Sequence, residues 1–223
     1  MVSFCRDGST YFSPRRVFIE LDELYSSVKI TTRNERKVIE ELQTTAAFVA
    51  GIAKHDGIER WIRLSEVNES SPDTYVLELH PYAKSGKVIG QEKIEHPVEV
   101  VTFNDYSSED FLSFLNRTKL SNKYPSTYTL LCMLNKKQKR FELKQASDSI
   151  KSLGVDFTVG IVAKTSEDES YTSALLSPGY YVWDEYKLMD LMKTQSKDIV
   201  KLTRGAGTHF IAYQGSERLI EIL

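Results

Sequence analysis

The sequence is short of the features that assign a protein to a class by themselves, beginning with cysteine. Only two cysteines occur in 223 residues, Cys5 and Cys132, and neither has a Cys-x-x-Cys partner. A thiolate zinc site is therefore not expected. Two free thiols in apolar surroundings are typical of a reducing compartment, so we expect a cytoplasmic protein.

Long apolar runs are missing as well. No stretch approaches the ~20 apolar residues that a membrane-spanning helix needs, and the N-terminus has no signal-peptide core. No association with a membrane is expected.

An excess of positive charge is also absent, because the formal net charge is −2. No global basic field would draw the protein to nucleic acid, although a local basic patch is compatible with this balance. The four histidines lack the i, i+4 spacing of a helical zinc pair. Glu78 and His80 share one strand face, where they form either a metal pair or part of a solvated surface.

What remains is the composition of a folded protein, with 41% hydrophobic and 27% charged residues. The length suits one domain, and no segment reads as a linker. We expect a single domain over 1–223, with its core over 33–163 and a C-terminal extension over 164–223.

The strongest helix signal covers 33–54. Thr32 and Glu35 predict a capping box at its start, and apolar residues recur at helical spacing along one side. Asp56 and Gly57 predict its end. The sequence then predicts a meander of three strands, over 60–67, 74–82 and 97–103, with a turn at 84–87.

Strands and helices alternate after that meander. Apolar strand patterns at 97–103, 128–134 and 155–163 are separated by helix patterns near 110 and over 140–153. Such alternation predicts parallel strands joined by helical crossovers. Continuous apolar runs of this kind are covered on both faces, which predicts burial of four side chains, those of Leu131, Met133, Val159 and Ile161.

The two ends of the chain read as additions to this core. The N-terminal pattern predicts a hairpin over 2–13 and a strand over 16–22. The C-terminal pattern predicts a strand over 171–177, a helix over 185–195 capped by Asp184, and a hairpin over 209–223. The predicted fold class is α/β or α+β, with a mixed central sheet flanked by helices and hairpin additions at both ends.

Glu99 is the unusual residue of the central strands. Side chains alternate along a strand, so Glu99 shares one face with Val101 and Phe103, and both faces of the strand 97–103 are mostly apolar. A buried carboxylate is destabilising by several kcal/mol unless it is paired, hydrogen-bonded or metal-bound. Glu99 therefore reaches solvent, pairs with a basic residue, or belongs to a functional site.

Asp73 is the second acid of interest. It follows Pro72 just before the strand 74–82, and Glu99 lies on the next long strand. This Pro-Asp and Glu pair resembles the motif of the PD-(D/E)XK nuclease superfamily. The order of leading helix, antiparallel meander, helix, strand and helix is also similar to that family's core, over roughly 33–163.

The resemblance implies a restriction-endonuclease-like core acting on DNA or RNA. Asp73 and Glu99 would hold Mg²⁺ or Mn²⁺, which polarises the phosphate and lowers the pKa of an attacking water. A lysine usually follows the Glu by two residues, but Val101 stands there. Lys137 is a candidate replacement, although its basic surroundings also fit a solvated helix start.

The leading helix of that family often supplies a further acid. Glu35 is the candidate, because successive helical residues turn by about 100° and Glu35 falls on the stripe of Leu42 and Val49. Glu40 points away from this stripe. The capping box explains Glu35 equally well.

Two functions follow from these residues. The first is a metal-dependent nuclease-like protein, with a degenerate active site as one form of it. The second is a non-catalytic interaction or regulatory protein on the same fold, such as an accessory factor of a phage, a mobile element or a defence system, with a protein partner. The missing Glu-x-Lys pattern and the lack of net positive charge favour the second.

Overall fold

The computed structural model describes residues 2–66, 71–104, 109–122, 124–135, 143–164, 170–187, 197–205 and 209–222. The helices are α1 (Pro14–Ser27), α2 (Arg33–Asp56), α3 (Phe111–Leu115), the π-helical turn η1 (Asn116–Leu120) and α4 (Leu143–Ser152). The strands are β1 (Val2–Phe4), β2 (Thr10–Phe12), β3 (Trp61–Leu64), β4 (Thr74–Lys84), β5 (Lys87–Asn104), β6 (Thr129–Asn135), β7 (Thr158–Lys164), β8 (Ser170–Ser177), β9 (Tyr181–Lys187), β10 (Ile199–Arg204), β11 (Phe210–Gln214) and β12 (Ile220–Ile222).

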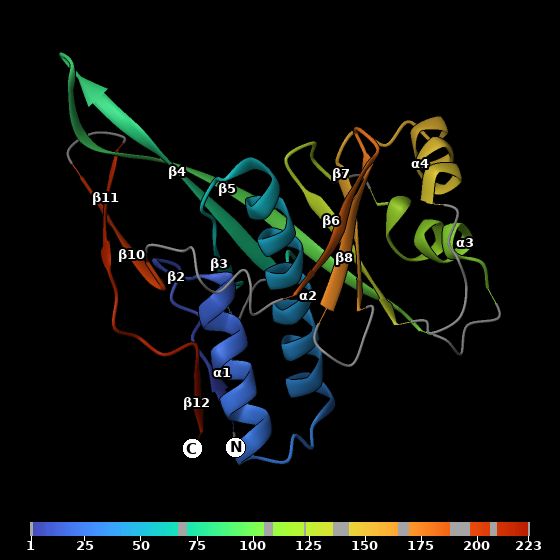
Figure 1. Cartoon of the computed structure of the whole chain (residues 1–223), viewed down its shortest axis with the longest axis horizontal. Coiled ribbons are helices and arrows are strands. Elements are labelled where there is room, and N and C mark those ends of the chain that lie inside the picture. The colour runs from blue at the N-terminus through green and yellow to red at the C-terminus, as the bar shows by residue number, and fades with distance from the viewer. Residues whose placement is uncertain are drawn as a thin grey trace.

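A large mixed sheet organises the molecule, so the predicted α/β fold class is confirmed. Its strand order is β11-β10-β2-β3-β4-β5-β6-β7-β8-β9. β3, β4 and β5 form the predicted antiparallel meander, and β5, β6 and β7 are parallel, as the alternation predicted. Helices α1 and α2 lie on one face, while α3 and α4 lie on the other (Figure 1).

Helix α2 packs closely on the sheet where its buried side carries small residues, such as Ala47 and Gly51. Its predicted capping box is present, and Gly57 ends it in the left-handed conformation at φ 71°. Tyr186 of β9 donates a hydrogen bond of 2.5 Å from its hydroxyl to the Ala47 carbonyl. A Cβ at Gly51 would lie only 3.0 Å from that Tyr186 ring, so the helix approaches the sheet where it carries glycine.

The other half of the sheet closes on itself. Phe210 of β11 pairs with Gln91 of β5, which completes a ring of six strands, β11-β10-β2-β3-β4-β5. Inside this six-strand ring lies a separate apolar cluster of Tyr11, Trp61, Leu77, Val200 and Leu202.

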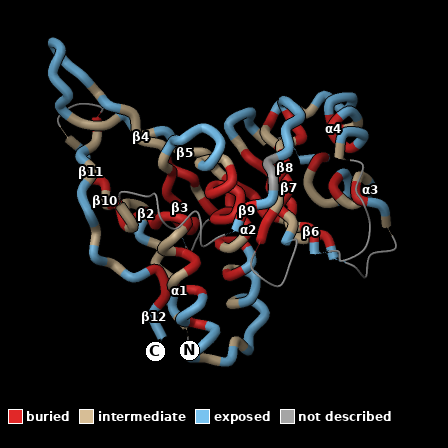
Figure 2. Tube along the Cα trace, in the orientation of Figure 1, coloured by how far each residue is buried: buried red, intermediate tan, exposed pale blue. Residues whose placement is uncertain are grey.

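The hairpin of β4 and β5 extends beyond the ring as an arm, defined here as residues 81–90. The predicted turn is confirmed at its tip, where Ser85 and Gly86 have φ values of 51° and 77°. The arm projects from the body of the molecule and is exposed along almost all of its length (Figures 1 and 2). The sequence analysis missed it because β5 begins at Lys87 instead of near 97.

Several expectations for the chain ends are wrong. Residues 16–22 lie in helix α1, which begins with Ser13 as N-cap and Pro14 at the first helical position. The hairpin over 2–13 does not form, because β1 pairs with β12 while β2 pairs with β10 and β3. The hairpin over 209–223 is also wrong, because β11 pairs with β10 and β5.

Two further expectations need correction. Asp184 does not cap a helix, because residues 181–187 form strand β9; the rest of the expected helix 185–195 lies outside the described residues. Leu131, Val159 and Ile161 are buried as predicted, but Met133 is only partly buried. Both cysteine thiols are free. In the described part of the chain, no helix combines the length and apolar character needed to cross a membrane.

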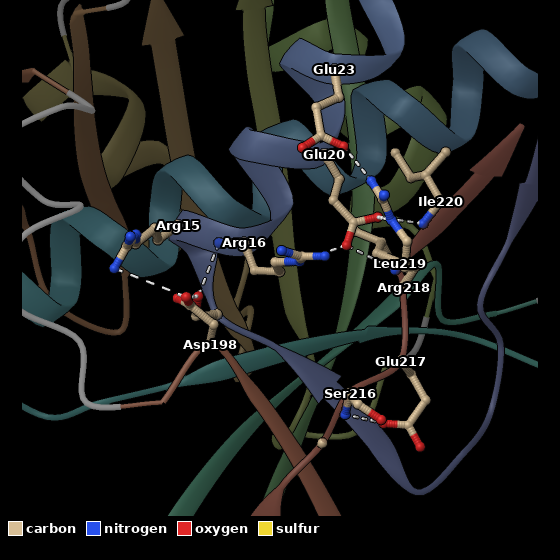
Figure 3. Close-up of polar contacts among 12 residues, drawn as sticks. Arg15, Arg16, Glu20, Glu23, Asp198, Ser216, Glu217, Arg218, Leu219 and Ile220 are labelled. Atoms are coloured by element: carbon tan, nitrogen blue, oxygen red, sulfur yellow. Dashed lines mark hydrogen bonds and ion pairs between the residues drawn. The ribbon is translucent and has the colours of Figure 1, made fainter.

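A buried carboxylate ties the C-terminal strand to α1. Glu20 accepts hydrogen bonds from the backbone N–H groups of Leu219, at 3.1 Å, and Ile220, at 2.8 Å (Figure 3). Arg16 and Arg218 supply the balancing positive charge, at 2.6 Å and 3.7 Å from the carboxylate. The segment that leads into β12 is therefore held by charge as well as by its pairing with β1.

Replacing Glu20 tests this attachment. Glu20→Gln removes the charge that both arginines balance and one of the two backbone acceptors. Because breaking a buried, hydrogen-bonded ion pair is strongly destabilising, we expect a loss of about 2–4 kcal/mol in the free energy of unfolding. The control is Glu23→Gln, at a solvated carboxylate that also pairs with Arg218 and should change stability by less than about 1 kcal/mol. Equal urea midpoints for the two variants would contradict this account.

Candidate functional site

Asp73 lies at the point where β4 begins. β4 pairs with β5 from the Thr74 and Val98 positions onward, so the N–H of Val100 lies beyond the reach of the β4 backbone. The Asp73 carboxylate accepts a hydrogen bond from that N–H at 2.8 Å. The side chain thereby extends the β4–β5 hydrogen-bond ladder beyond the first residue of β4. Its second oxygen stays available for other groups.

Glu41 approaches Asp73 from helix α2. The Lys37 ammonium lies one helical turn earlier, 3.0 Å from Glu41 Oε1 and 3.4 Å from Asp73 Oδ1. Glu41 is only 6% exposed, and its buried Oε1 atom accepts no aligned hydrogen bond. Two carboxylates thus lie side by side with one lysine between them and the solvent.

The pKa of Glu41 is raised to about 7. Burial is the largest cause, since it penalises the charged carboxylate, and the negative charge of Asp73 acts in the same direction. Lys37 opposes both effects without cancelling them. Near neutral pH the Glu41 carboxyl is therefore protonated in part of the molecules.

Glu99 is buried, at 4% exposure, and it is paired. The Ser71 hydroxyl donates a hydrogen bond of 2.7 Å to one carboxylate oxygen, and the Lys119 ammonium of η1 binds the other. Of the interpretations of Glu99, pairing with a basic residue is confirmed. Burial alone would lower the pKa of Lys119, but the hydrogen bond and charge of Glu99 outweigh it, so the pKa is raised.

These two groups of charges meet around Asp73. The negative charge of Asp73 contributes to the raised pKa of Lys119 as well as to that of Glu41. Glu41 comes from the face of the sheet covered by α2, whereas Lys119 and Glu99 lie toward α3. We call the five residues Lys37, Glu41, Asp73, Glu99 and Lys119 the acid–lysine cluster.

Glu35, the acid expected from the leading helix, does not join this cluster. Its carboxylate accepts hydrogen bonds from the Thr32 N–H and hydroxyl at the helix start, and from the Val2 N–H at 3.3 Å. Capping is therefore its observed role. Lys137, the suggested replacement lysine, lies outside the described residues.

Glu41 and Lys119 were missed by the sequence analysis. Glu41 follows Val38 by three residues and precedes Thr45 by four, so it lies on the buried side of α2. A buried acid four residues after Lys37 was a detectable signal. Lys119 carried no such signal, because it reaches Glu99 from a different element.

The alternative site at Glu78 is explained by local pairing. Arg60 donates a hydrogen bond of 2.6 Å to Glu78, while His80 lies 3.4 Å from it and His96 3.8 Å. Among the described residues, no group of three or more His, Cys, Asp or Glu side chains is arranged to hold a metal ion.

A smaller set of ligands is compatible with Mg²⁺ or Mn²⁺. Mg²⁺ is often held by one or two carboxylates, with waters and substrate phosphate completing its coordination. Glu41 and Asp73 offer two such carboxylates, and the buried Glu41 Oε1 atom lacks a hydrogen bond. The pair therefore has the donor chemistry that a divalent cation requires.

Comparison with protein-family models, curated proteins and solved structures finds no match to this chain. The chemistry of the cluster is therefore the basis for assigning a function.

The raised pKa of Glu41 predicts how stability depends on pH. The folded state binds more protons than the unfolded state between about 4.3, the ordinary glutamate value, and about 7. Stability should therefore fall as pH rises through this window. Glu41→Gln should remove that fall and make the protein more stable than the parent at pH ~8.

Urea unfolding at several pH values between ~4 and ~8 measures this effect. Glu40→Gln is the matched control, since Glu40 is the preceding residue on α2 and is exposed. The account fails if Glu41→Gln keeps the parent's pH dependence, or if Glu40→Gln removes it equally.

Proposed function

We propose that this chain is a metal-dependent nuclease-like protein that acts on nucleic acid. The observation that supports the proposal best is the acid–lysine cluster, in which acids from α2, from the start of β4 and from β5 gather with two lysines. Its acids lie on the same kinds of elements as those that the PD-(D/E)XK resemblance implies. The proposed cofactor is Mg²⁺ or Mn²⁺.

Asp73 and Glu41 are the proposed metal ligands. The sequence suggested Asp73 with Glu99, but the Lys119 ammonium already binds Glu99 and is only 25% exposed. Lys37 is 68% exposed, so it can leave Glu41 and Asp73 without disturbing packed structure. When bound, the metal would polarise a phosphate and lower the pKa of an attacking water.

Lys119 takes the proposed place of the lysine that Val101 does not supply. Its ammonium is held in position by Glu99, which is itself fixed by Ser71. A fixed positive charge beside a reacting phosphate stabilises the negative charge that develops there. Glu99 acts through Lys119, and its role is to position that side chain.

A non-catalytic interaction or regulatory protein is the second candidate function. It is favoured by the charge balance of the cluster, because a lysine contacts each of its three carboxylates. An ion-pair network of this kind stabilises a fold and needs no metal.

Thermal melts with and without Mg²⁺ or Mn²⁺ separate the two candidates. If the metal binds the folded state, a hundredfold excess over its dissociation constant adds about 2.7 kcal/mol of stability. Asp73→Asn and Glu41→Gln should each abolish this shift. The control is Glu35→Gln, which should lower stability through its capping box but keep the metal-dependent shift.

Cleavage of labelled nucleic acid completes the test. Lys119→Ala should reduce cleavage by about a hundredfold or more while leaving the metal-induced shift in place. A parent protein with neither a metal-dependent shift nor cleavage would rule out the nuclease proposal and leave the interaction protein.

A further inference from the structure

The arm carries the local positive charge that the overall composition hides. Lys84 and Lys87 are exposed at its tip, and the sequence over 81–91 contains no acidic residue. No ion pair is found for either lysine within the described residues, although many other cations of the protein have a carboxylate partner. The chain's net charge of −2 therefore coexists with a positively charged projection.

Pairing across the arm places these two charges together. Lys84 lies directly opposite Lys87 in the register of β4 and β5. Like charges in directly opposed positions of an antiparallel pair repel each other and destabilise it. An anion bound at the tip would remove that repulsion.

The base of the arm packs against the start of β11, and further positive charge lies nearby. The Tyr82 ring stacks on His209 with a centroid separation of 5.3 Å and an interplanar angle of 6°. A Cβ at Gly90 would collide with that His209 ring at 2.3 Å, so the arm and β11 are in tight contact. Arg204, at the end of β10, is exposed on the strand next to β11.

With nucleic acid taken as the ligand from the proposed function, we infer that the arm enters the major groove of duplex DNA. That groove is about 12 Å wide and accepts a two-stranded β-ribbon, whereas the deep, narrow major groove of A-form RNA does not. Lys84, Lys87 and Arg204 contact phosphates along the groove. Val88, which is 65% exposed, meets the apolar surface of thymine methyl groups.

The length of β5 relates the arm to the acid–lysine cluster. Twelve residue steps separate Lys87 from Glu99 on this one strand, so at about 3.3 Å per residue they lie at most ~40 Å apart. One turn of B-form DNA is about 34–36 Å long. A single duplex lying along β5 can therefore reach the arm and the cluster within about one turn of each other.

The test measures binding of fluorescent DNA in buffer without divalent cations, so that no cleavage occurs. The arm variant is Lys84→Gln with Lys87→Gln. A plot of log K against log salt has a negative slope, and each lost phosphate contact reduces its magnitude by about 0.9. The magnitude should therefore be smaller by about 2 in the arm variant. Binding at low salt should weaken about tenfold or more.

The matched control removes two exposed lysines elsewhere, Lys54→Gln with Lys151→Gln. It should leave the affinity and the salt slope at parental values. Equal weakening by both double variants would overturn the inference, because bulk charge would then explain binding. A parent that binds single-stranded DNA or duplex RNA as well as duplex DNA would also overturn it.

Association with a second copy is the competing use of an exposed arm. Sedimentation equilibrium of parent and arm variant decides this point. A parental dimer that the arm variant loses, with DNA binding unchanged, would assign the arm to self-association and overturn the inference.

The arm and the proposed nuclease activity fail independently. Arm-dependent duplex binding without metal-dependent cleavage would support the arm and defeat the nuclease proposal. Metal-dependent cleavage by the parent, together with normal duplex binding by the arm variant, would support the nuclease proposal and defeat the inference about the arm.

Discussion

The architecture depends on β5, which serves two parts of the sheet at once. A strand has only two edges, and β5, with 18 residues, changes partners along its length. One edge pairs with β4 and the other with β11 near Gln91 and with β6 from Val98 onward. β4 begins at Thr74, opposite Val98, so it does not reach the N–H of Val100, and the Asp73 carboxylate accepts the hydrogen bond from that N–H. The acid–lysine cluster lies at this change of partners.

Three buried glutamates show three degrees of compensation. Glu20 has two backbone N–H donors and two arginines, and Glu99 has a hydroxyl and a lysine. Within the described residues, Lys37, which is solvated, is the one cation in contact with Glu41, and Glu41 lies beside another carboxylate. Buried charge that is poorly compensated lowers stability, and such groups concentrate at functional sites. The negative charge of Glu41 is therefore the least compensated of the three, and Glu41 is the best marker of the candidate site.

Short-range sequence signals predicted much of the fold. The capping box of Thr32 and Glu35, the glycine at 57 and the alternation after residue 97 are short-range signals, and the structure has the corresponding α2 and parallel strands. The strand prediction for residues 16–22 is wrong because their apolar residues fit the helical period as well as the strand period. Ser13 and Pro14 form a helix-start signal that favours the helix. The terminal hairpins failed because strand pairing there is set by distant partners.

For the candidate site, too, some features could be predicted from the sequence and others could not. The burial and pairing of Glu99 could be anticipated because a carboxylate in an apolar strand conflicts with its surroundings. Asp73 was proposed because it precedes a strand, and its role as a metal ligand stays a prediction. The partner of Glu99 could not be predicted, since twenty residues and a change of element separate it from Lys119. Glu35 was preferred over Glu40 on a helical projection, and Glu41 was not considered. Such a projection cannot tell where along the helix the sheet edge lies.

The six-strand ring also constrains how the chain can fold. β2, at residues 10–12, is completed on one side by β10, at residues 199–201, and β1 by β12. Contacts this far apart in sequence form slowly, because a long loop must close before they contribute. Because synthesis runs from the N-terminal to the C-terminal side, α2, the meander and the β2–β3 pair can assemble while β1 still lacks β12 and β2 still lacks β10. Until β10 and β12 have been made, the edge of β2 that β10 covers and the edge of β1 that β12 covers are open to other chains.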